Sequence, residues 1–281
     1  MKRAVALFAG VAAAATSALA FGAWRWRRSH AAFRAKMLAA RRPMAVKVYN
    51  AVETEALPPP VRRYFRAVLQ EGQAMVSGVR LSQRGRFRQS LASDTWQPLR
   101  ATQRVTTHPP GFGWDARIRL ALGVRVFVRD AYVLGTGSLR ACVLGLVTVA
   151  DLHDTPEIAR GELMRYLAEA VWYPTALLPS QGVRWEAIDD TSSRATLTDG
   201  ATTVCLEFRF RADGLVAAVW AASRPRSATE SAPWLCRLDS YERRAGMCVP
   251  LFAEVEWQLP AGPAPYFQGR LTGIVYEFDA R

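Results

Sequence analysis

The chain has 281 residues, 50% of them hydrophobic, and carries 37 Lys and Arg against 24 Asp and Glu. This length suffices for one large domain or two small ones. The composition excludes an intrinsically disordered chain, a disulfide-stapled miniprotein and a membrane protein with many spans.

The formal net charge of +13 is concentrated at the N-terminus. Ten basic residues lie in residues 1–47 and no acidic residue precedes Glu53, so residues 48–281 hold 27 basic and 24 acidic residues, a net charge of +3. A nucleic-acid-binding domain would instead carry a basic stripe with interleaved aromatics on its body. We therefore expect no nucleic-acid partner.

Residues 4–24 form an uncharged run of 21 residues, long enough to cross a bilayer as a helix. One interpretation is a cleavable signal peptide, with a small-x-small cleavage site at Ala18–Ala20. The favoured alternative is a permanent transmembrane anchor, with Trp24 and Trp26 at the interface, because a dense basic start would hinder export. The basic residues 25–47 are then expected to contact anionic lipid headgroups, or else to form a solvated helical stalk.

The sequence therefore divides into an N-terminal anchor and stalk, residues 1–47, and a single domain, residues 48–281. The positive-inside rule predicts a single-pass protein of the bacterial inner membrane with its body in the cytoplasm. A periplasmic body is the alternative.

The body changes from one short helix to the period of β-strands. Pro58–Pro60 is followed by Val61, Tyr64 and Phe65 at helical spacing, which predicts a helix that begins at the prolines. From Met75 the apolar residues alternate, which indicates strands with one solvated face. Further strands are expected near residues 97–107, 112–120, 124–134, 137–149, 183–188, 193–198, 202–211, 214–223, 233–242, 247–258 and 266–278.

Within the segment 137–149, Leu139–Val149 is mostly apolar and is expected to form a central or fully covered strand. Asp199-Gly200, Asp213-Gly214 and Ala245-Gly246 predict tight hairpin turns. The fold class is therefore α+β and β-rich: one long, curved, half-barrel-like antiparallel sheet, with a mid-chain helix at 157–170 that covers one face and with the N-terminal transmembrane helix before it.

The mid-chain helix has an apolar arc and a charged face. Glu162, Arg165 and Glu169 fall together opposite the arc and are expected to form solvated ion pairs. Arg160 projects from within the arc, so it must be paired or must face a wet cavity. A structural ion pair and a ligand-facing position at a pocket mouth are the two interpretations.

The chain after this helix suits either the rim of a groove or a plug at the end of a barrel. Trp172 and Tyr173 are large aromatics with polar tips and precede an apolar stretch between prolines. With Arg160 and the inward-facing Tyr166, they are the candidate ligand-binding residues. No cofactor or metal site is expected.

Catalytic patterns are few. His108 and His153 are the histidines of the body, and both lie in predicted loops. No nucleophile elbow, zinc-protease motif or P-loop occurs. Four carboxylates lie on predicted strands, and nothing selects a catalytic pair among them: Asp115, Asp130, Glu207 and Glu256.

The four cysteines have no C-x-x-C spacing, which argues against a zinc or thioredoxin-like site. In a two-residue hairpin at Ala245-Gly246, Cys248 faces Arg243 and Cys236 faces Val255, too far apart for a disulfide. We interpret Cys142, Cys205, Cys236 and Cys248 as small hydrophobic residues.

Four segments carry a family resemblance: Pro58–Tyr64, Gly161–Glu169, Trp172–Leu177 and Pro233-Trp234. Through them, about residues 57–278 resemble an uncharacterised bacterial family of membrane-anchored proteins. The resemblance implies a shared architecture and a shared helix, and it transfers no activity. At the level of the fold, the long sheet with its helix also resembles the half-barrels of lipoprotein carriers.

The leading hypothesis is a membrane-anchored binding module for a lipid or another apolar ligand, held between the sheet and the helix with Arg160 near a polar headgroup. A hydrolase or lipid-modifying enzyme that uses carboxylates and a loop histidine is the second hypothesis. A structural partner in a membrane complex, with its concavity filled by its own side chains, is the third.

Overall fold

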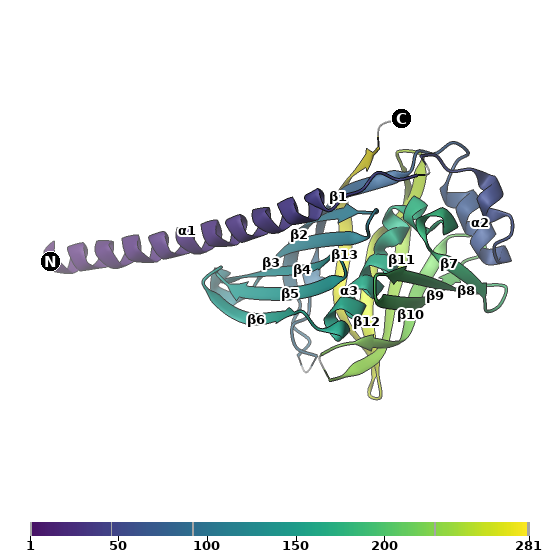
Figure 1. The fold of residues 1–281 in the computed structure, drawn as a ribbon. Coiled ribbons are helices and arrows are strands. Elements are labelled where there is room, and N and C mark those ends of the chain that lie inside the picture. Colours follow the sequence, from purple (N-terminus) through teal and green to yellow (C-terminus); the bar gives the residue numbers. More distant parts are fainter. Residues whose placement is uncertain (1, 46, 92, 228, 280–281) are drawn as a thin grey trace.

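The computed structural model describes residues 2–45, 47–91, 93–227 and 229–279 (Figure 1). In these residues, thirteen strands form one antiparallel sheet that curves around a single helix, as the alternating sequence pattern predicts. The strands are β1 (Val76–Phe87), β2 (Gln97–Thr106), β3 (Gly111–Arg119), β4 (Arg125–Val133), β5 (Thr136–Val143), β6 (Val147–His153), β7 (Arg184–Ala187), β8 (Ser192–Asp199), β9 (Thr202–Phe210), β10 (Val216–Pro225), β11 (Ser231–Arg244), β12 (Met247–Leu259) and β13 (Gly262–Phe278).

Strands from the middle of the chain form the two edges of the sheet. The order is β6-β5-β4-β3-β2-β1-β13-β12-β11-β10-β9-β8-β7, so the first and last strands pair at the centre and β6 and β7 lie at opposite edges. The chain between these edges must therefore cross the sheet. It does so on the concave side, as helix α3 (Pro156–Glu169) (Figure 1).

The crossing begins and ends with clear local signals. Thr155 caps α3, because its hydroxyl accepts a hydrogen bond from the Ile158 N–H at 3.2 Å, and Pro156 occupies the first turn. Three short 3-10 helices lead on to β7: η3 (Ala170–Trp172), η4 (Pro174–Leu177) and η5 (Pro179–Gln181). A further 3-10 turn, η2 (Ala121–Gly123), joins β3 to β4.

The prediction of one covered strand at 137–149 is wrong. These residues form two strands, β5 and β6, that turn back on each other at Leu144-Gly145. Val143 pairs with Val147, so the loop has three residues, and Leu144 and Gly145 within it have positive φ values of 54° and 71°. The strand β6 lies at the edge, where Val147 and Val149 are exposed.

The predicted turns at Asp199-Gly200, Asp213-Gly214 and Ala245-Gly246 each join two paired strands, and the register predicted for the last of them is confirmed. Arg244 pairs with Met247, Arg243 with Cys248, and Cys236 with Val255, as a two-residue turn at Ala245-Gly246 requires. The four cysteines are free.

Helix α2 (Pro59–Val68) packs on the body near β8 and β12, beside the 3-10 turn η1 (Ala51–Thr54). Its apolar positions Val61, Tyr64 and Phe65 are fully buried, as their helical spacing predicts. The helix begins at Pro59, where the missing N–H of proline costs nothing because the first N–H groups of a helix have no intrahelical acceptor.

Helix α1 (Lys2–Ala39) lies with its second half against the outer face of the sheet (Figure 1). Trp26, His30 and Met37 recur at helical spacing and are buried. The Trp26 indole N–H donates a hydrogen bond to the Asp115 carboxylate at 2.9 Å. Gly113 lets the helix approach, because a Cβ at this position would overlap the ring of Phe33.

The first half of α1 coincides with the predicted membrane anchor, residues 4–24. Several side chains of that run, at positions 4–7, 11, 12 and 15, lie outside the described residues. Among the residues that are described, no helix combines the length and the apolar character needed to cross a membrane. The transmembrane helix predicted from the sequence is thus not supported.

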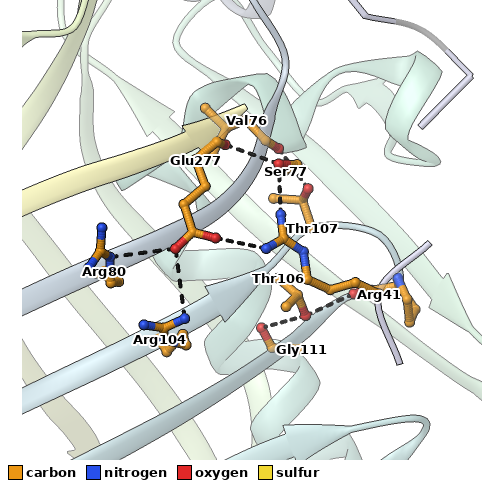
Figure 2. A network of polar contacts seen from close by, with 10 residues as sticks. Arg41, Val76, Ser77, Arg80, Arg104, Thr106, Thr107, Gly111 and Glu277 are labelled. Carbon is orange, nitrogen blue, oxygen red and sulfur yellow. Dashed lines mark hydrogen bonds and ion pairs between the residues drawn. The ribbon is translucent and has the colours of Figure 1, made fainter. Parts of the chain in front are cut away.

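A network of arginines around Glu277 joins the chain after α1 to the central strands (Figure 2). The Glu277 carboxylate lies 2.7 Å from Arg41, 3.5 Å from Arg80 and 3.7 Å from Arg104. Arg41 also donates to the Ser77 hydroxyl at 2.8 Å. One carboxylate on β13 therefore links residue 41 to β1 and β2.

Candidate functional site

A cavity of about 690 Å³ lies between α3 and the concave face of the sheet. Most of its lining side chains are apolar. They come from both halves of the sheet, with Ile118, Val126 and Val128 on β3 and β4, and Val255 and Phe267 on β12 and β13. The strand alternation that turns these residues inward places their polar neighbours on the outer face.

The cavity reaches solvent near the first turn of α3. Val149, Leu152 and His153 on β6, Glu157 on α3 and Ser227 after β10 line the cavity and are also exposed. The exposed apolar side chains Val149 and Leu152 therefore lie at its mouth.

Charged residues interrupt the apolar wall where α3 faces β4. Arg165 lies 2.7 Å from Asp130 and 2.8 Å from Glu169, and its guanidinium lies over the rings of Phe112 and Trp114. Despite burial, the two carboxylates raise the pKa of Arg165 above its ordinary value. This arginine is thus fully neutralised.

Glu162 is the most unusual residue of the wall. Its side chain is 4% exposed, and its Oε2 atom has no hydrogen-bond partner among the described residues. Burial, together with the nearby carboxylate of Asp130, raises the pKa of Glu162 to about 8, although Arg165 and Arg224 oppose the shift. At neutral pH the carboxyl is therefore mostly protonated and can donate a hydrogen bond.

Arg224 enters the cavity from β10, opposite Glu162 on α3. Its guanidinium donates to the Gly161 carbonyl at 3.2 Å and lies 5.2 Å and 5.7 Å from the ring centres of Trp234 and Trp257. In the described part of the chain no carboxylate forms an ion pair with it, and its buried Nε has no partner. The aromatic rings thus hold this cation in place without neutralising it.

Of the four candidate residues from the sequence, only Trp172 lines the cavity. Tyr166 and Tyr173 are buried in the core beside it, and the Tyr173 hydroxyl donates to the Tyr166 carbonyl at 3.2 Å. Arg160 is exposed and does not line the cavity. A role of these residues in binding stays a prediction.

The prediction of a solvated charged face on the mid-chain helix is wrong. Glu162 is buried, and the side chains of Arg165 and Glu169 are only 15% and 14% exposed. The reason is topological: α3 crosses inside a curved sheet, with β4 and β5 on one side and β9 and β10 on the other, so that both of its faces are covered. Sequence reasoning also missed Arg224, although a lone arginine in an apolar strand is a usable signal.

The residues of the enzyme hypothesis are dispersed. Among its carboxylates, Asp130 lines the cavity, whereas Asp115 binds Trp26 on the outer face. His153 lines the mouth and His108 does not, and within the described residues neither forms an ion pair with a carboxylate. The remaining two, Glu207 and Glu256, pair with Arg209 and Arg237. The described part of the chain also contains no group of three or more His, Cys, Asp or Glu residues suited to a metal ion.

Comparison with known proteins identifies a family whose function is unknown. A model of a family of unknown function, DUF6920, matches residues 55–276, which confirms the resemblance of residues 57–278 to an uncharacterised family. No curated protein matches the chain. Among solved structures, a LolA superfamily protein from Nitrosomonas europaea is similar, with 11% identity, a TM-score of 0.36, and coverage of 79% of this chain and 93% of that one.

Proposed function

The chain belongs to DUF6920, a family of unknown function, and we propose that it binds the apolar chain of a lipid or a similar amphiphile between α3 and the sheet. The observation that carries this proposal is the cavity of about 690 Å³ with its mostly apolar wall. Ligand sites in proteins usually measure about 300–1,000 Å³ and are apolar with a few polar groups. Both features match a long-chain amphiphile.

The architecture supports a carrier or sensor of lipid more than a catalyst. Within the described residues, neither candidate histidine forms an ion pair with a carboxylate. The apolar cavity, by contrast, has exposed apolar side chains at its mouth and charged residues, Glu162 and Arg224, in its wall. Val149 and Leu152 at the mouth would contact the apolar chain as it enters.

The proposal is tested by narrowing the cavity from one wall. Ala141 on β5 lines the cavity between Val128 and Ala150 on the neighbouring strands. In an Ala141→Phe variant the ring would occupy volume that the ligand needs, so the full-length protein should carry less co-purifying lipid. Native mass spectrometry of the purified chain measures the lipid bound per protein.

The matched control is Ala187→Phe, at an exposed position of β7 on the opposite edge of the sheet and outside the cavity lining. This variant should retain the lipid content of the wild type. Equal lipid content in all three proteins, or no lipid in a folded wild type that also fails to bind an added fatty acid, would contradict the proposal.

We further propose that the N-terminal part of α1, residues 2–24, attaches the protein to a lipid surface, in place of the membrane span predicted from the sequence. It extends beyond the sheet (Figure 1), and its apolar side chains Phe8, Phe21 and Trp24 are exposed. The basic Arg27 and Arg28 follow closely after Trp24 and are exposed too. Co-sedimentation with anionic vesicles should be lost when residues 2–21 are deleted. Undiminished co-sedimentation of that variant would refute the attachment.

A further inference from the structure

We propose that Arg224 and Glu162 form a recognition site inside the cavity for an anionic head group, so that the ligand is an amphiphile with a carboxylate or a phosphate. This inference rests on the proposed binding of an apolar chain and adds the chemistry of the other end of the ligand. The two residues approach from opposite elements, α3 and β10, and both line the cavity.

The first argument is the charge of the wall. Four arginines line the cavity, and three of them form ion pairs: Arg88 with Asp94, Arg165 with Asp130 and Glu169, and Arg226 with Glu230. Arg224 forms none within the described residues. Arg224 is only partly exposed and, in the described part of the chain, has no carboxylate paired with it, and an anionic head group in the cavity would supply the missing partner.

The second argument is geometric. The guanidinium of Arg224 lies over the rings of Trp234 and Trp257, which are paired neighbours on β11 and β12. Trp257 stacks on Tyr266, whose hydroxyl accepts from the Trp234 indole N–H at 2.9 Å. This arrangement fixes the orientation of the cation before any ligand binds. Because guanidinium can form two parallel hydrogen bonds, it suits the oxygens of a carboxylate or a phosphate.

The third argument is the unpartnered oxygen of Glu162. This residue adjoins Gly161, whose carbonyl accepts the hydrogen bond from Arg224. Its carboxyl is buried beside Asp130 and Glu169, and these neighbours favour its protonated form. A protonated carboxyl donates to an anionic oxygen, whereas an ionised one would repel it.

The other charges in this region of the wall are Arg165 and the two carboxylates that contact it. Glu169 uses one oxygen to accept from Arg165 and the other to accept from Gln103, at 2.6 Å. Asp130 is paired with Arg165. With Glu162 protonated, the two cations Arg165 and Arg224 balance the two carboxylates Asp130 and Glu169. Both carboxylates contact Arg165, so Arg224 is the cation of this group that an anionic head group can pair with directly.

The test compares three amphiphiles that share a sixteen-carbon chain: palmitic acid, hexadecyl phosphate and the neutral hexadecanol. Their affinity for the delipidated full-length protein is measured by displacement of a fluorescent fatty-acid analogue. Wild-type protein should prefer one or both anionic ligands over hexadecanol by about 10- to 100-fold, the range of a charge-assisted pair of hydrogen bonds. The tighter of the two anions identifies a carboxylate or a phosphate as the natural head group.

Arg224→Gln should abolish that preference and leave the affinity for hexadecanol within about threefold. Arg194→Gln is the matched control, an exposed arginine on β8 outside the cavity, and should behave as wild type. If Arg224→Gln fails to fold, the preference of the wild-type protein alone decides. Equal binding of hexadecanol and the anions by wild type overturns the head-group site only, whereas binding of none of the three overturns the proposed function as well.

Discussion

The Arg165 guanidinium lies 2.7 Å from the Asp130 carboxylate and joins α3 to β4 on the inside of the sheet. The same guanidinium binds Glu169 one helical turn away, and both partners are more than four-fifths buried. Burial raises the pKa of Asp130, and Arg165 opposes that shift. The stability of the crossing helix therefore depends on this one cation.

Replacing Arg165 with Met should destabilise the protein strongly. The variant leaves two buried carboxylates without a cation, a change that typically costs about 3–5 kcal/mol. Urea denaturation monitored by tryptophan fluorescence measures the free energy of unfolding. Arg160→Met, near the exposed N-terminal end of the same helix, should change it by less than about 0.5 kcal/mol. Similar losses in the two variants would show that the Asp130 pair contributes little.

A second prediction concerns the pH dependence of stability. The folded-state pKa of Glu162 is about 8, against an ordinary value of 4.5, so between these pH values the folded protein holds a proton that the unfolded chain has released. The unfolding free energy should therefore fall by roughly 1 kcal/mol for each pH unit from about 5 to 8 because of this residue, and then level off. Glu162→Gln should remove that component.

The measurement is thermal unfolding of wild type and Glu162→Gln between pH 5 and pH 9. The melting temperature of Glu162→Gln relative to that of the wild type should increase as the pH rises. The control Glu157→Gln, at an exposed position of the same helix, should show no such increase. A constant difference in melting temperature at all pH values would mean that Glu162 is ionised throughout.

The sequence predicts the sheet well because its signals are local. Apolar alternation and glycine turns identify the strands, and the hairpin at Ala245-Gly246 is correct to the residue pair. The turn at Leu144-Gly145 escapes detection because Leu144 adopts a left-handed conformation that apolar residues rarely take. An apolar residue at that position hides the turn within a continuous hydrophobic run.

The candidate site is harder to predict because it depends on topology. Glu162 and Arg165 lie on a helix face that, by its sequence alone, resembles any solvated face. Only the pairing of β1 with β13 makes β6 and β7 the edges and forces α3 across the concave side. Arg224 and Trp234 come together there from different strands, and no local pattern encodes that meeting.

A third prediction concerns the junction in Figure 2. Glu277→Gln removes the carboxylate that Arg41, Arg80 and Arg104 share, so three cations would be left near one another. Because these side chains are partly exposed, the expected loss of stability is modest, about 1 kcal/mol. Hydrogen–deuterium exchange should rise in the segment that follows α1, at residues 40–45.

Glu242→Gln is the control for this junction, because Glu242 pairs with Arg244 at an exposed position on β11. It should leave exchange in residues 40–45 unchanged. If Glu277→Gln also leaves that exchange unchanged, the contact of Arg41 with Ser77 and the packing of α1 are sufficient to hold the junction.

The last prediction links the head-group site to pH. Raising the pH through about 8 deprotonates Glu162 and places a negative charge where the anionic head group would lie. The carboxylates of Asp130 and Glu169 and the cations Arg165 and Arg224 surround this position. The affinity for palmitic acid or hexadecyl phosphate should then fall, approaching about tenfold per pH unit above 8, while the affinity for hexadecanol stays constant. Glu162→Gln should bind the anionic ligand with little change over pH 7–9, since its amide cannot ionise and still donates a hydrogen bond. The displacement measurement repeated across this range decides the matter: a parallel fall for the neutral ligand, or for the Gln variant, would locate the titrating group elsewhere.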